Sequence, residues 1–337
     1  MMQISPEIQL FIREHSSDDV RVLALQAKKY PDIDMPTVIT QIAGRKVAAE
    51  KIPSWWEIEK IWYPKHLSLE QCSSEITARY KARLLQGDSL TDLTGGFGID
   101  CSFLATGFKS ATYVERQEEL CEIAAHNFPV LNLNHINIKN EDGVTYLQAM
   151  SPVDCLFLDP ARRNEHGGKT VAISDCEPNV AELEELLLQK ANRVMIKLSP
   201  MLDLSLALKE LKQTQEVHIL SVNNECKELL ILLGQTSPAE ISIHCVNLFT
   251  KGTQKEQHFV FTREQEQCSE CTYTDSLETY LYEPNASLLK AGAFRSIAAA
   301  YPVRKLHPNS HLYTSDTFIE NFPGRIFRIA VSYTHLT

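Results

Sequence analysis

Apolar positions divide the chain into a helical first part and a second part in which strands and helices alternate. Up to residue 82 they recur at helical spacing, which predicts helices over 7–14, 18–28, 35–51 and 69–84. From Leu90 onward, short apolar runs separate helical stretches such as 121–128, 180–189 and 204–212. This alternation is typical of an α/β fold with a doubly wound, mostly parallel sheet.

The expected strands are short apolar runs, and several end at acids or turn residues. They cover 90–92, 110–115, 137–141, 153–158, 193–200, 216–222, 228–234 and 239–246, which indicates a sheet of about seven strands with a final antiparallel hairpin. Further on, a helix over 287–301 and extended pieces near Leu312 and Ile326 indicate a small α+β part. We therefore expect domains at 1–82, 83–266 and 267–337.

The strand 90–92 runs into a glycine-rich turn with an acid on each side. Its candidate ligand-binding residues are Asp92, Thr94, Gly95, Gly96, Gly98 and Asp100. Glycines at the carboxyl end of such a strand let the backbone approach a ligand. The spacing departs from the dinucleotide-binding motif, because Cys101 stands where a third glycine belongs.

The acids indicate which ligand this turn binds. A pyrophosphate would be repelled by Asp92 and Asp100, which disfavours nicotinamide and flavin dinucleotides. S-adenosylmethionine has no phosphate and carries an ammonium and a sulfonium, so carboxylates attract it. The turn therefore favours S-adenosylmethionine as the cofactor.

Acids also follow the next two strands. Glu115 ends the strand 110–115, 23 positions after Asp92, where a carboxylate would accept hydrogen bonds from both ribose hydroxyls of an adenosine-containing ligand. The alternative is that Glu115 is simply a solvated glutamate at the end of this strand. Asp142, at the tip of the third strand, would accept the adenine amino group or form an ordinary Asp-Gly turn.

The fourth strand ends in Asp159-Pro160-Ala161-Arg162, where we expect the chemistry. Proline biases Asp159 towards an extended conformation, so that its carboxylate and nearby carbonyls can face a pocket above the sheet. Acceptors aimed at an exocyclic amine favour the positive charge that develops during methyl transfer. Arg162 and Arg163 would hold phosphates. The predicted catalytic residues are Asp159, Pro160 and Arg162, and the alternative is a strand-ending turn.

Two segments of the helical part have two interpretations each. In the predicted helix 69–84, Gln71, Ser74 and Thr77 share one face by their spacing of three. They would reach the carboxylate of the cofactor or cap neighbouring loops. The aromatic segment 54–63 would pack the helices onto the sheet or stack a base.

Several segments together resemble one known family. They are Pro53-Ser54-Trp55, the 68–75 segment with Gln71 and Ser74, Thr77-Ala78, Tyr80-Lys81-Ala82, the glycine turn, Asp159-Pro160-Ala161-Arg162, Tyr282-Glu283-Pro284-Asn285 and Gly292. Over most of its length the chain is similar to the bacterial class I S-adenosylmethionine-dependent methyltransferases that carry a C-terminal THUMP-like domain.

The resemblance implies a Rossmann-like sheet with an N-terminal helical cap and a C-terminal THUMP-like domain. It implies cofactor contacts at Asp92, Gly95, Gly96 and Glu115, and a substrate pocket at Asp159. Members of the family continue well beyond the segment 322–325, so the resemblance also implies that the C-terminal domain is incomplete and that 331–337 is not a native end.

Composition agrees with a globular protein of the cytoplasm. Of the 337 residues 44% are hydrophobic, and no apolar run approaches the roughly 20 residues that span a membrane. The first residues lack the features of a signal peptide. The nine cysteines are expected to be reduced, and Cys268 and Cys271 have no second pair, so no metal is expected. Cys155 and Cys176 lie in no basic setting that would make them nucleophiles.

The net charge of −10 argues against a surface that is basic throughout. Between Lys290 and Arg328, however, basic residues outnumber acids and are interleaved with histidines and tyrosines. We expect this stretch to hold RNA, the alternative being an ordinary solvated face.

These patterns predict a methyltransferase that uses S-adenosylmethionine to methylate a base nitrogen of ribosomal or transfer RNA by direct in-line transfer. Two other classes remain as alternatives. One is a non-catalytic RNA-binding or assembly protein on the same fold, and the other is a dinucleotide-dependent oxidoreductase.

Overall fold

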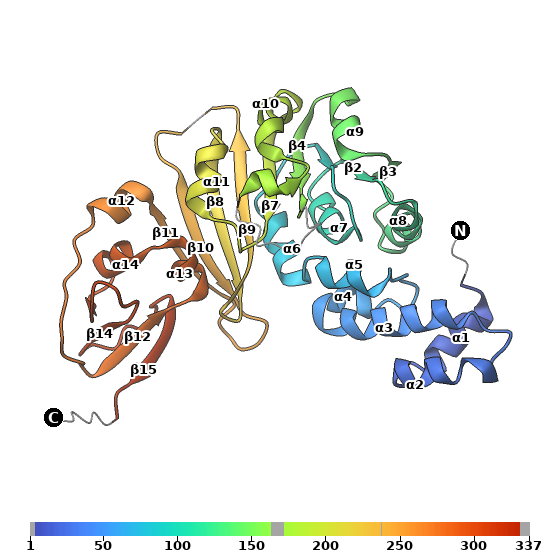
Figure 1. Cartoon of the computed structure of the whole chain (residues 1–337), viewed down its shortest axis with the longest axis horizontal. Helices are drawn as coiled ribbons and strands as arrows, with labels where there is room; N and C mark the ends of the chain where they lie inside the picture. Colours follow the sequence, from blue (N-terminus) through green and yellow to red (C-terminus); the bar gives the residue numbers. More distant parts are fainter. Residues whose placement is uncertain (1–3, 163–171, 237, 331–337) are drawn as a thin grey trace. The chain divides into compact units, whose positions relative to one another are not determined.

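The computed structural model describes residues 4–162, 172–236 and 238–330, and these form two compact units (Figure 1). The first unit holds 1–158 together with 189–193, and the second holds 159–188 and 194–337. Arg163 and the segment 331–337 lie outside the described residues.

The first unit begins with helices and continues with alternating strands and helices. Its helices and strands are α1 Pro6–Glu14, α2 Val20–Leu25, the 3₁₀ turn Ala27–Lys29, α3 Met35–Lys51, α4 Pro53–Trp56, α5 His66–Gln71, α6 Glu75–Ala82, β1 Ser89–Asp92, α7 Ile99–Ala105, β2 Ser110–Glu115, α8 Glu118–Val130, β3 Ile136–Asn140, α9 Gly143–Ala149 and β4 Val153–Leu158.

Local capping explains where the first helices begin. Ser5 and Asp34 accept hydrogen bonds from backbone amides in the first turns of α1 and α3, and a proline lies at the start of each. A core of buried apolar residues joins α1, α2 and α3, with Phe11, Leu23 and Val38 among them.

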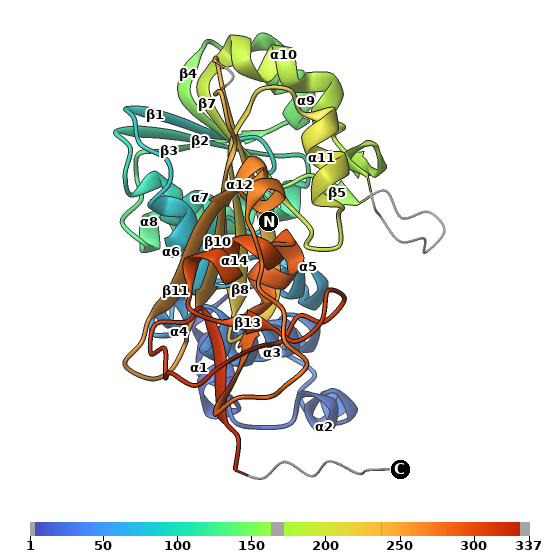
Figure 2. The same ribbon diagram turned by 90° about the vertical axis from the view of Figure 1, so that its left-hand side faces the viewer.

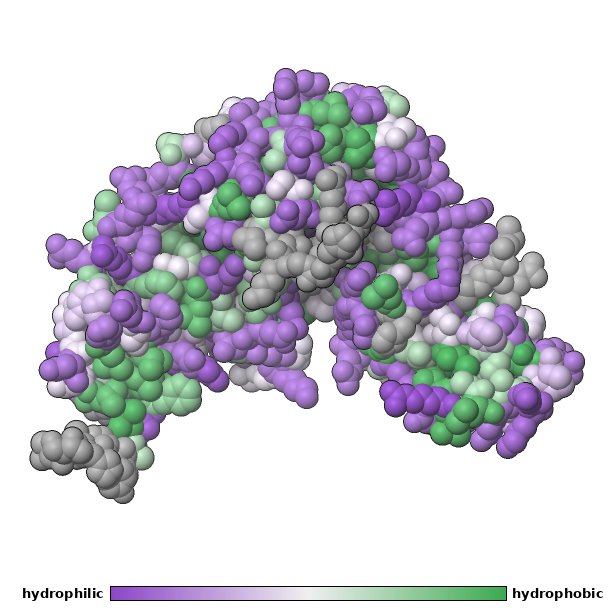
Figure 3. Space-filling model, in the orientation of Figure 1, coloured by the Kyte–Doolittle hydropathy of each residue, from purple (hydrophilic) through white to green (hydrophobic). Residues whose placement is uncertain are grey.

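Hydrophilic residues cover most of the surface in the view of Figure 3.

Strands β1 to β4 of the first unit are parallel and lie in the order β4-β1-β2-β3. The register pairs Leu90 of β1 with Ala111 of β2 and with Cys155 of β4. In both ribbon views, α8 and α9 lie on opposite faces of β2 and β3 (Figures 1 and 2). The prediction of an α/β fold is confirmed, and the ends of β1 and β2 carry the predicted acids.

The second unit continues the alternation and ends in a separate small sheet. Its elements are β5 Ala161–Arg162, the 3₁₀ turn Ile173–Asp175, β6 Cys176–Glu177, α10 Val180–Lys190, β7 Ala191–Leu198, α11 Leu204–Glu210, β8 Thr214–Val222, β9 Glu225–Gly234, β10 Ser242–Leu248, β11 Glu256–Thr262, α12 Arg263–Cys268, β12 Tyr280–Pro284, α13 Ala286–Ala291, α14 Phe294–Ala300, β13 Arg304–Lys305, β14 Tyr313–Ser315 and β15 Gly324–Arg328. The last residues of α10 and the first of β7 group with the first unit.

Strands β8 and β10 are parallel neighbours, whereas β9 pairs antiparallel with β8, and β11 antiparallel with β10. Helix α13 packs against β8, β9 and β10. The sequence did not predict β11, because its apolar residues, Phe259, Val260 and Phe261, form a run of only three after three polar positions.

The C-terminal sheet is antiparallel, in the order β13-β14-β12-β15. Two residues that carried the family resemblance define the ends of helix α13, which follows β12. Asn285 caps α13 through hydrogen bonds that its Oδ1 accepts from the amides of Ser287 and Leu288. Gly292 ends that helix with a φ of 76°, a conformation that favours glycine. The small α+β part is confirmed.

Candidate functional site

The turn after β1 holds the first candidate carboxylate in a buried position. Asp92 is 1% exposed, and its Oδ1 accepts a hydrogen bond from the amide of Thr94 at 3.0 Å. The amide of Leu93 donates to the carbonyl of Phe157 at 3.0 Å, which fixes the turn to the end of β4. Asp92 is therefore held at the carboxyl edge of the parallel strands, as the sequence predicted.

A different structural feature accounts for glycine at each of the three positions in the turn. A Cβ on Gly95 would lie 2.3 Å from the ring of Tyr113, so close packing requires glycine there. Gly98 has a φ of 87° and immediately precedes α7. Gly96 has a φ of 55°, and its missing Cβ would meet only the carbonyl of Thr94, 3.7 Å away. Gly96 thus leaves open space beside its backbone, where a ligand can approach.

Glu115 joins this turn to the end of β2. Its Oε2 accepts a hydrogen bond from the amide of Gly96 at 2.9 Å, and its Oε1 accepts one from the amide of Gln117 at 2.8 Å. The side chain is 8% exposed. Each carboxylate oxygen can accept more than one hydrogen bond, so these contacts orient Glu115 and still allow it to accept from ribose hydroxyls.

Tyr113 packs against the glycine turn and donates a hydrogen bond to it. Its ring is fully buried, and its hydroxyl donates to the carbonyl of Gly96. Burial, reinforced by the nearby Glu115, raises the pKa of this phenol well above its ordinary value, so it remains a hydrogen-bond donor. The structure thus brings Asp92, Thr94, Gly95, Gly96, Gly98 and Glu115 together in one unit.

Asp100, the second acid of the turn, has strong partners within the protein. Its Oδ1 lies 3.0 Å from Nζ of Lys81, and its Oδ2 accepts a hydrogen bond from the hydroxyl of Ser73 at 2.7 Å. The Lys81 side chain is completely buried. Because Lys81 neutralises this acid, Asp92 and Glu115 supply the negative charge beside Gly96, and a cofactor contact by Asp100 remains a prediction.

The expected continuous helix over 69–84 is wrong. Helix α5 ends at Gln71 and α6 begins at Glu75, with Cys72 and Ser74 in extended conformations between them. Ser74 stays near Thr77, with 3.2 Å between the two hydroxyl oxygens, whereas Gln71 is exposed on the preceding helix. The three residues therefore do not share one helical face.

Asp142 lies at the tip of β3, as predicted, and begins α9. Its Oδ1 accepts hydrogen bonds from the amides of Val144 and Thr145, both at 3.0 Å. This is the geometry of an N-cap. Recognition of adenine by Asp142 remains a prediction.

The aromatic segment before α5 packs against the glycine turn. Trp55 is 2% exposed, and its ring meets that of Phe97 edge to face with 5.2 Å between centroids. Trp62 stacks on His126, with 3.8 Å between the ring centroids. The packing interpretation is confirmed for Trp55, which connects the N-terminal helices to the turn.

In the second unit, Asp159 forms an ion pair that was not predicted from the sequence. Oδ2 of Asp159 contacts Nζ of Lys197 in β7, and the Lys197 side chain is only 10% exposed. Pro160 follows Asp159, and Arg162 belongs to β5, which pairs with β6. A lysine inside the apolar run 194–198 was the available signal, because a buried charge requires a partner.

Most basic residues between Lys290 and Arg328 have partners inside the protein. Nζ of Lys290 donates to the carbonyl of Leu202, and the buried Lys305 donates to the carbonyl of Pro308. Arg304 pairs with Glu278 and Arg325 with Glu283, but their side chains remain 45% and 57% exposed. The stretch therefore offers exposed arginines, whereas both of its lysines, Lys290 and Lys305, donate to carbonyls within the protein.

The thiol of Cys155 lies in β4 and is buried. Burial raises its pKa to about 11, so it is protonated at neutral pH. This agrees with a mechanism that uses no cysteine nucleophile.

Among the described residues, no helix has the length and the apolar character needed to cross a membrane.

One solved structure is similar to almost the whole chain. It is that of a "putative methyltransferase" from Porphyromonas gingivalis W83, with 36% identity and a TM-score of 0.84, and the match covers 96% of this chain and 81% of that one. This match extends the Rossmann-like assignment to both units and supports methyltransferase activity.

Other matches are weaker and cover about half of the chain. A modification subunit of a "putative type I restriction enzyme" from Vibrio vulnificus YJ016 has 12% identity and a TM-score of 0.40, covering 60% of this chain and 56% of that one. A "putative methyltransferase" from Streptococcus mutans in complex with SAH has 14% identity and a TM-score of 0.34, and the match covers 48% of this chain and 96% of that one.

Residues 280–323 match a family model described as a ferredoxin-like domain. The THUMP-like assignment of this region is not confirmed. A search of the curated proteins found no match.

Proposed function

Because this chain belongs to the methyltransferase family of the Porphyromonas gingivalis protein, we propose that it transfers the methyl group of S-adenosylmethionine to a base nitrogen of an RNA. The observation that carries the proposal is the pair of buried carboxylates at the glycine turn: Asp92, which precedes the turn, and Glu115, which accepts from the amide of Gly96, where the backbone is open. A cationic nucleoside fits this arrangement, whereas a pyrophosphate would meet two negative charges.

In this proposal Glu115, Asp92 and Gly96 have separate tasks in cofactor binding. Glu115 would accept hydrogen bonds from the ribose, while its existing bond to the Gly96 amide keeps the carboxylate oriented. Asp92 would attract the cationic part of the ligand, and the absence of a side chain at Gly96 would allow close approach. When bound, S-adenosylmethionine supplies an electrophilic methyl group.

Asp159 is the proposed acceptor for the amine that is methylated. It follows β4 by one residue, and Phe157 of β4 pairs with Asp92 of β1. A carboxylate directed at the protons of an exocyclic amine stabilises the positive charge that forms as the methyl group arrives. Lys197 would hold this carboxylate in position through its ion pair. Alignment and electrostatics supply the catalysis, and no covalent intermediate with the enzyme is required.

The exposed arginines support RNA as the substrate. Arg304 lies on β13, and Arg325 and Arg328 lie on β15, where guanidinium groups can contact phosphates. Phe327, 43% exposed, lies beside Arg325, with 5.8 Å from the guanidinium carbon to the ring centre. An exposed aromatic ring next to arginine is a common platform for an unpaired base.

Calorimetric titration with S-adenosylmethionine and with its demethylated product tests the cofactor. We expect micromolar binding to the wild-type chain and none to Asp92→Asn. Asp88→Asn is the matched control, because Asp88 precedes the same strand and pairs on the surface with Lys109. No binding at millimolar ligand would contradict the proposal and favour a non-catalytic protein on this fold.

Incubation with S-adenosylmethionine carrying a labelled methyl group tests the substrate. We expect label in RNA from cells that lack this protein, and none when Asp159→Asn replaces the wild type. Label confined to protein or small molecules would leave the cofactor assignment standing and show that RNA is the wrong substrate.

A further inference from the structure

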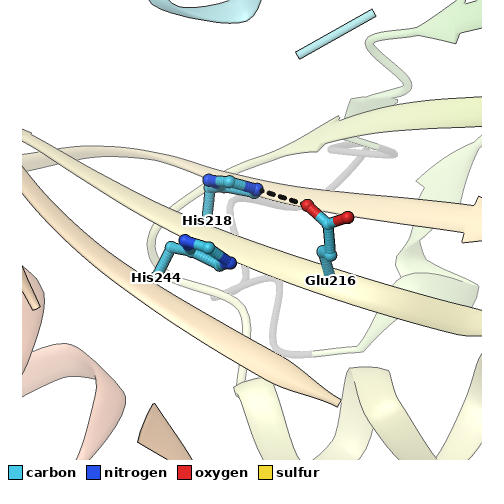
Figure 4. A group of neighbouring side chains, drawn as sticks. All are labelled: Glu216, His218 and His244. Carbon is cyan, nitrogen blue, oxygen red and sulfur yellow. Dashed lines mark hydrogen bonds and ion pairs between the residues drawn. The ribbon is translucent and has the colours of Figure 1, made fainter. Parts of the chain in front are cut away.

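A second group of chemically reactive side chains lies on the sheet of the second unit and takes no part in the proposed methyl transfer. Glu216 and His218 belong to β8, and His244 belongs to its parallel neighbour β10. The register pairs His218 directly with His244. Residues two apart on a strand point to the same face, so all three side chains share one face (Figure 4).

The distances within this group suit a metal ion. Nε2 of His218 lies 3.2 Å from Oε2 of Glu216. The two imidazole rings are stacked, with 4.3 Å between centroids and 15° between planes. One donor atom from each of the three residues lies within 4.8 Å of the others. A tetrahedral ion with bonds of about 2.0–2.1 Å separates its donors by about 3.3 Å, so small side-chain rotations would complete the site.

Burial holds the group in place and still leaves a path to solvent. The His218 side chain is only 3% exposed, whereas that of Glu216 is 33% exposed. On the other side of β8, Leu230 of β9 pairs with His218, so the neighbouring strand adds an apolar residue. Little reorganisation is needed at His218, and an ion can enter past Glu216.

His258 on β11 supplies the partner that metal-binding histidines usually have. Its Nε2 lies 3.1 Å from Nδ1 of His244. A proton on that Nδ1 would be donated to His258, leaving the lone pair of the His244 Nε2 for a metal. A hydrogen bond made by the ring nitrogen that does not bind the metal fixes the orientation and tautomer of a histidine ligand.

We propose that Glu216, His218 and His244 bind one zinc ion and thereby connect β8 to β10. Two imidazoles and a carboxylate are a known ligand set for zinc with an open fourth position. Calcium and magnesium prefer sites made of oxygen atoms only, and monovalent copper prefers sulfur. A water molecule would fill the fourth position.

Zinc binding to the full chain, prepared without a histidine tag and stripped with a chelator, tests the site. We expect one equivalent of zinc in competition with a chromogenic chelator, and a visible absorption band when cobalt replaces zinc. His244→Asn and Glu216→Gln should weaken zinc binding at least about 100-fold, and His258→Asn about 10- to 100-fold. His307→Asn, an exposed histidine elsewhere in the same unit, is the matched control.

Thermal unfolding separates loss of the site from loss of the fold. Zinc should raise the unfolding temperature of the wild type and of His307→Asn, and leave that of His244→Asn unchanged. Without metal, His244→Asn should unfold near the wild-type temperature, because His244 is only partly buried. Absence of stoichiometric zinc, or equal zinc affinity in His244→Asn and the wild type, would overturn the proposal.

Discussion

The backbone amide of Gly96 donates a hydrogen bond to Oε2 of Glu115, 2.9 Å away, while Oε1 of the same carboxylate accepts one from Gln117. One side chain therefore satisfies two backbone amides, one in the glycine turn and one after β2. An amide side chain cannot do the same, because one of its two ends carries hydrogens.

Glu115→Gln should consequently destabilise the first unit by about 1–3 kcal/mol, since one backbone amide would face the side-chain NH₂ group. Urea unfolding measures this difference. Glu118→Gln, on the exposed first turn of α8, should change stability by about 0.5 kcal/mol or less. Equal losses in the two variants would mean that the bonds to Glu115 contribute little.

Gly95→Ala should disturb the turn, because the added Cβ would lie 2.3 Å from the buried ring of Tyr113. We expect a loss of about 1–3 kcal/mol in unfolding free energy, together with weaker binding of S-adenosylmethionine. Gly107→Ala is the control, since its Cβ would meet only the Leu104 carbonyl at 3.8 Å. Wild-type stability and affinity in Gly95→Ala would contradict the packing argument.

Lys81→Met should be among the most destabilising single changes in the first unit. It leaves the Asp100 carboxylate, 9% exposed, without its buried cation, which costs about 3–5 kcal/mol. Chemical unfolding of Lys81→Met, of Asp100→Asn and of the double variant tests the pair. The double variant should recover part of the loss, and strict additivity would show that the two residues are not coupled.

Lys197→Met tests how Asp159 is held. If Lys197 positions this carboxylate, kcat for methyl transfer should fall up to about 100-fold, while affinity for S-adenosylmethionine stays near the wild-type value. Lys227→Met removes an exposed lysine that pairs with Glu225, and kcat should not change. A fall in cofactor affinity that parallels the fall in kcat would indicate general damage to the fold.

The sequence predicted those helices, strands and candidate site residues that depend on residues close together along the chain. The apolar run 153–158 predicts β4 because a strand buried on both faces needs apolar residues at successive positions. Asp92 and Glu115 could be found because each directly ends such a run. Helix α3 was predicted with the observed bounds, since its apolar spacing and its capping Asp34 are both local.

Long-range contacts could not be found in this way. The break between α5 and α6 places Ser73 beside Asp100, and nothing in the sequence around Ser73 indicates a partner 27 positions away. The pairing of Lys197 with Asp159 and the alignment of His218 with His244 likewise depend on strand order and register. Chemistry assembled across strands becomes visible only once the sheet is known.

The contact between Trp55 and Phe97 gives the protein an optical reporter of its own. The indole lies in the core beneath the turn that is proposed to bind the cofactor, and indole emission responds to the polarity of its surroundings. Movement of Phe97 would alter the environment of this tryptophan, whereas Trp56 is 41% exposed. With Trp56 and Trp62 replaced by phenylalanine, tryptophan fluorescence would therefore follow the conformation of the glycine turn without an added label.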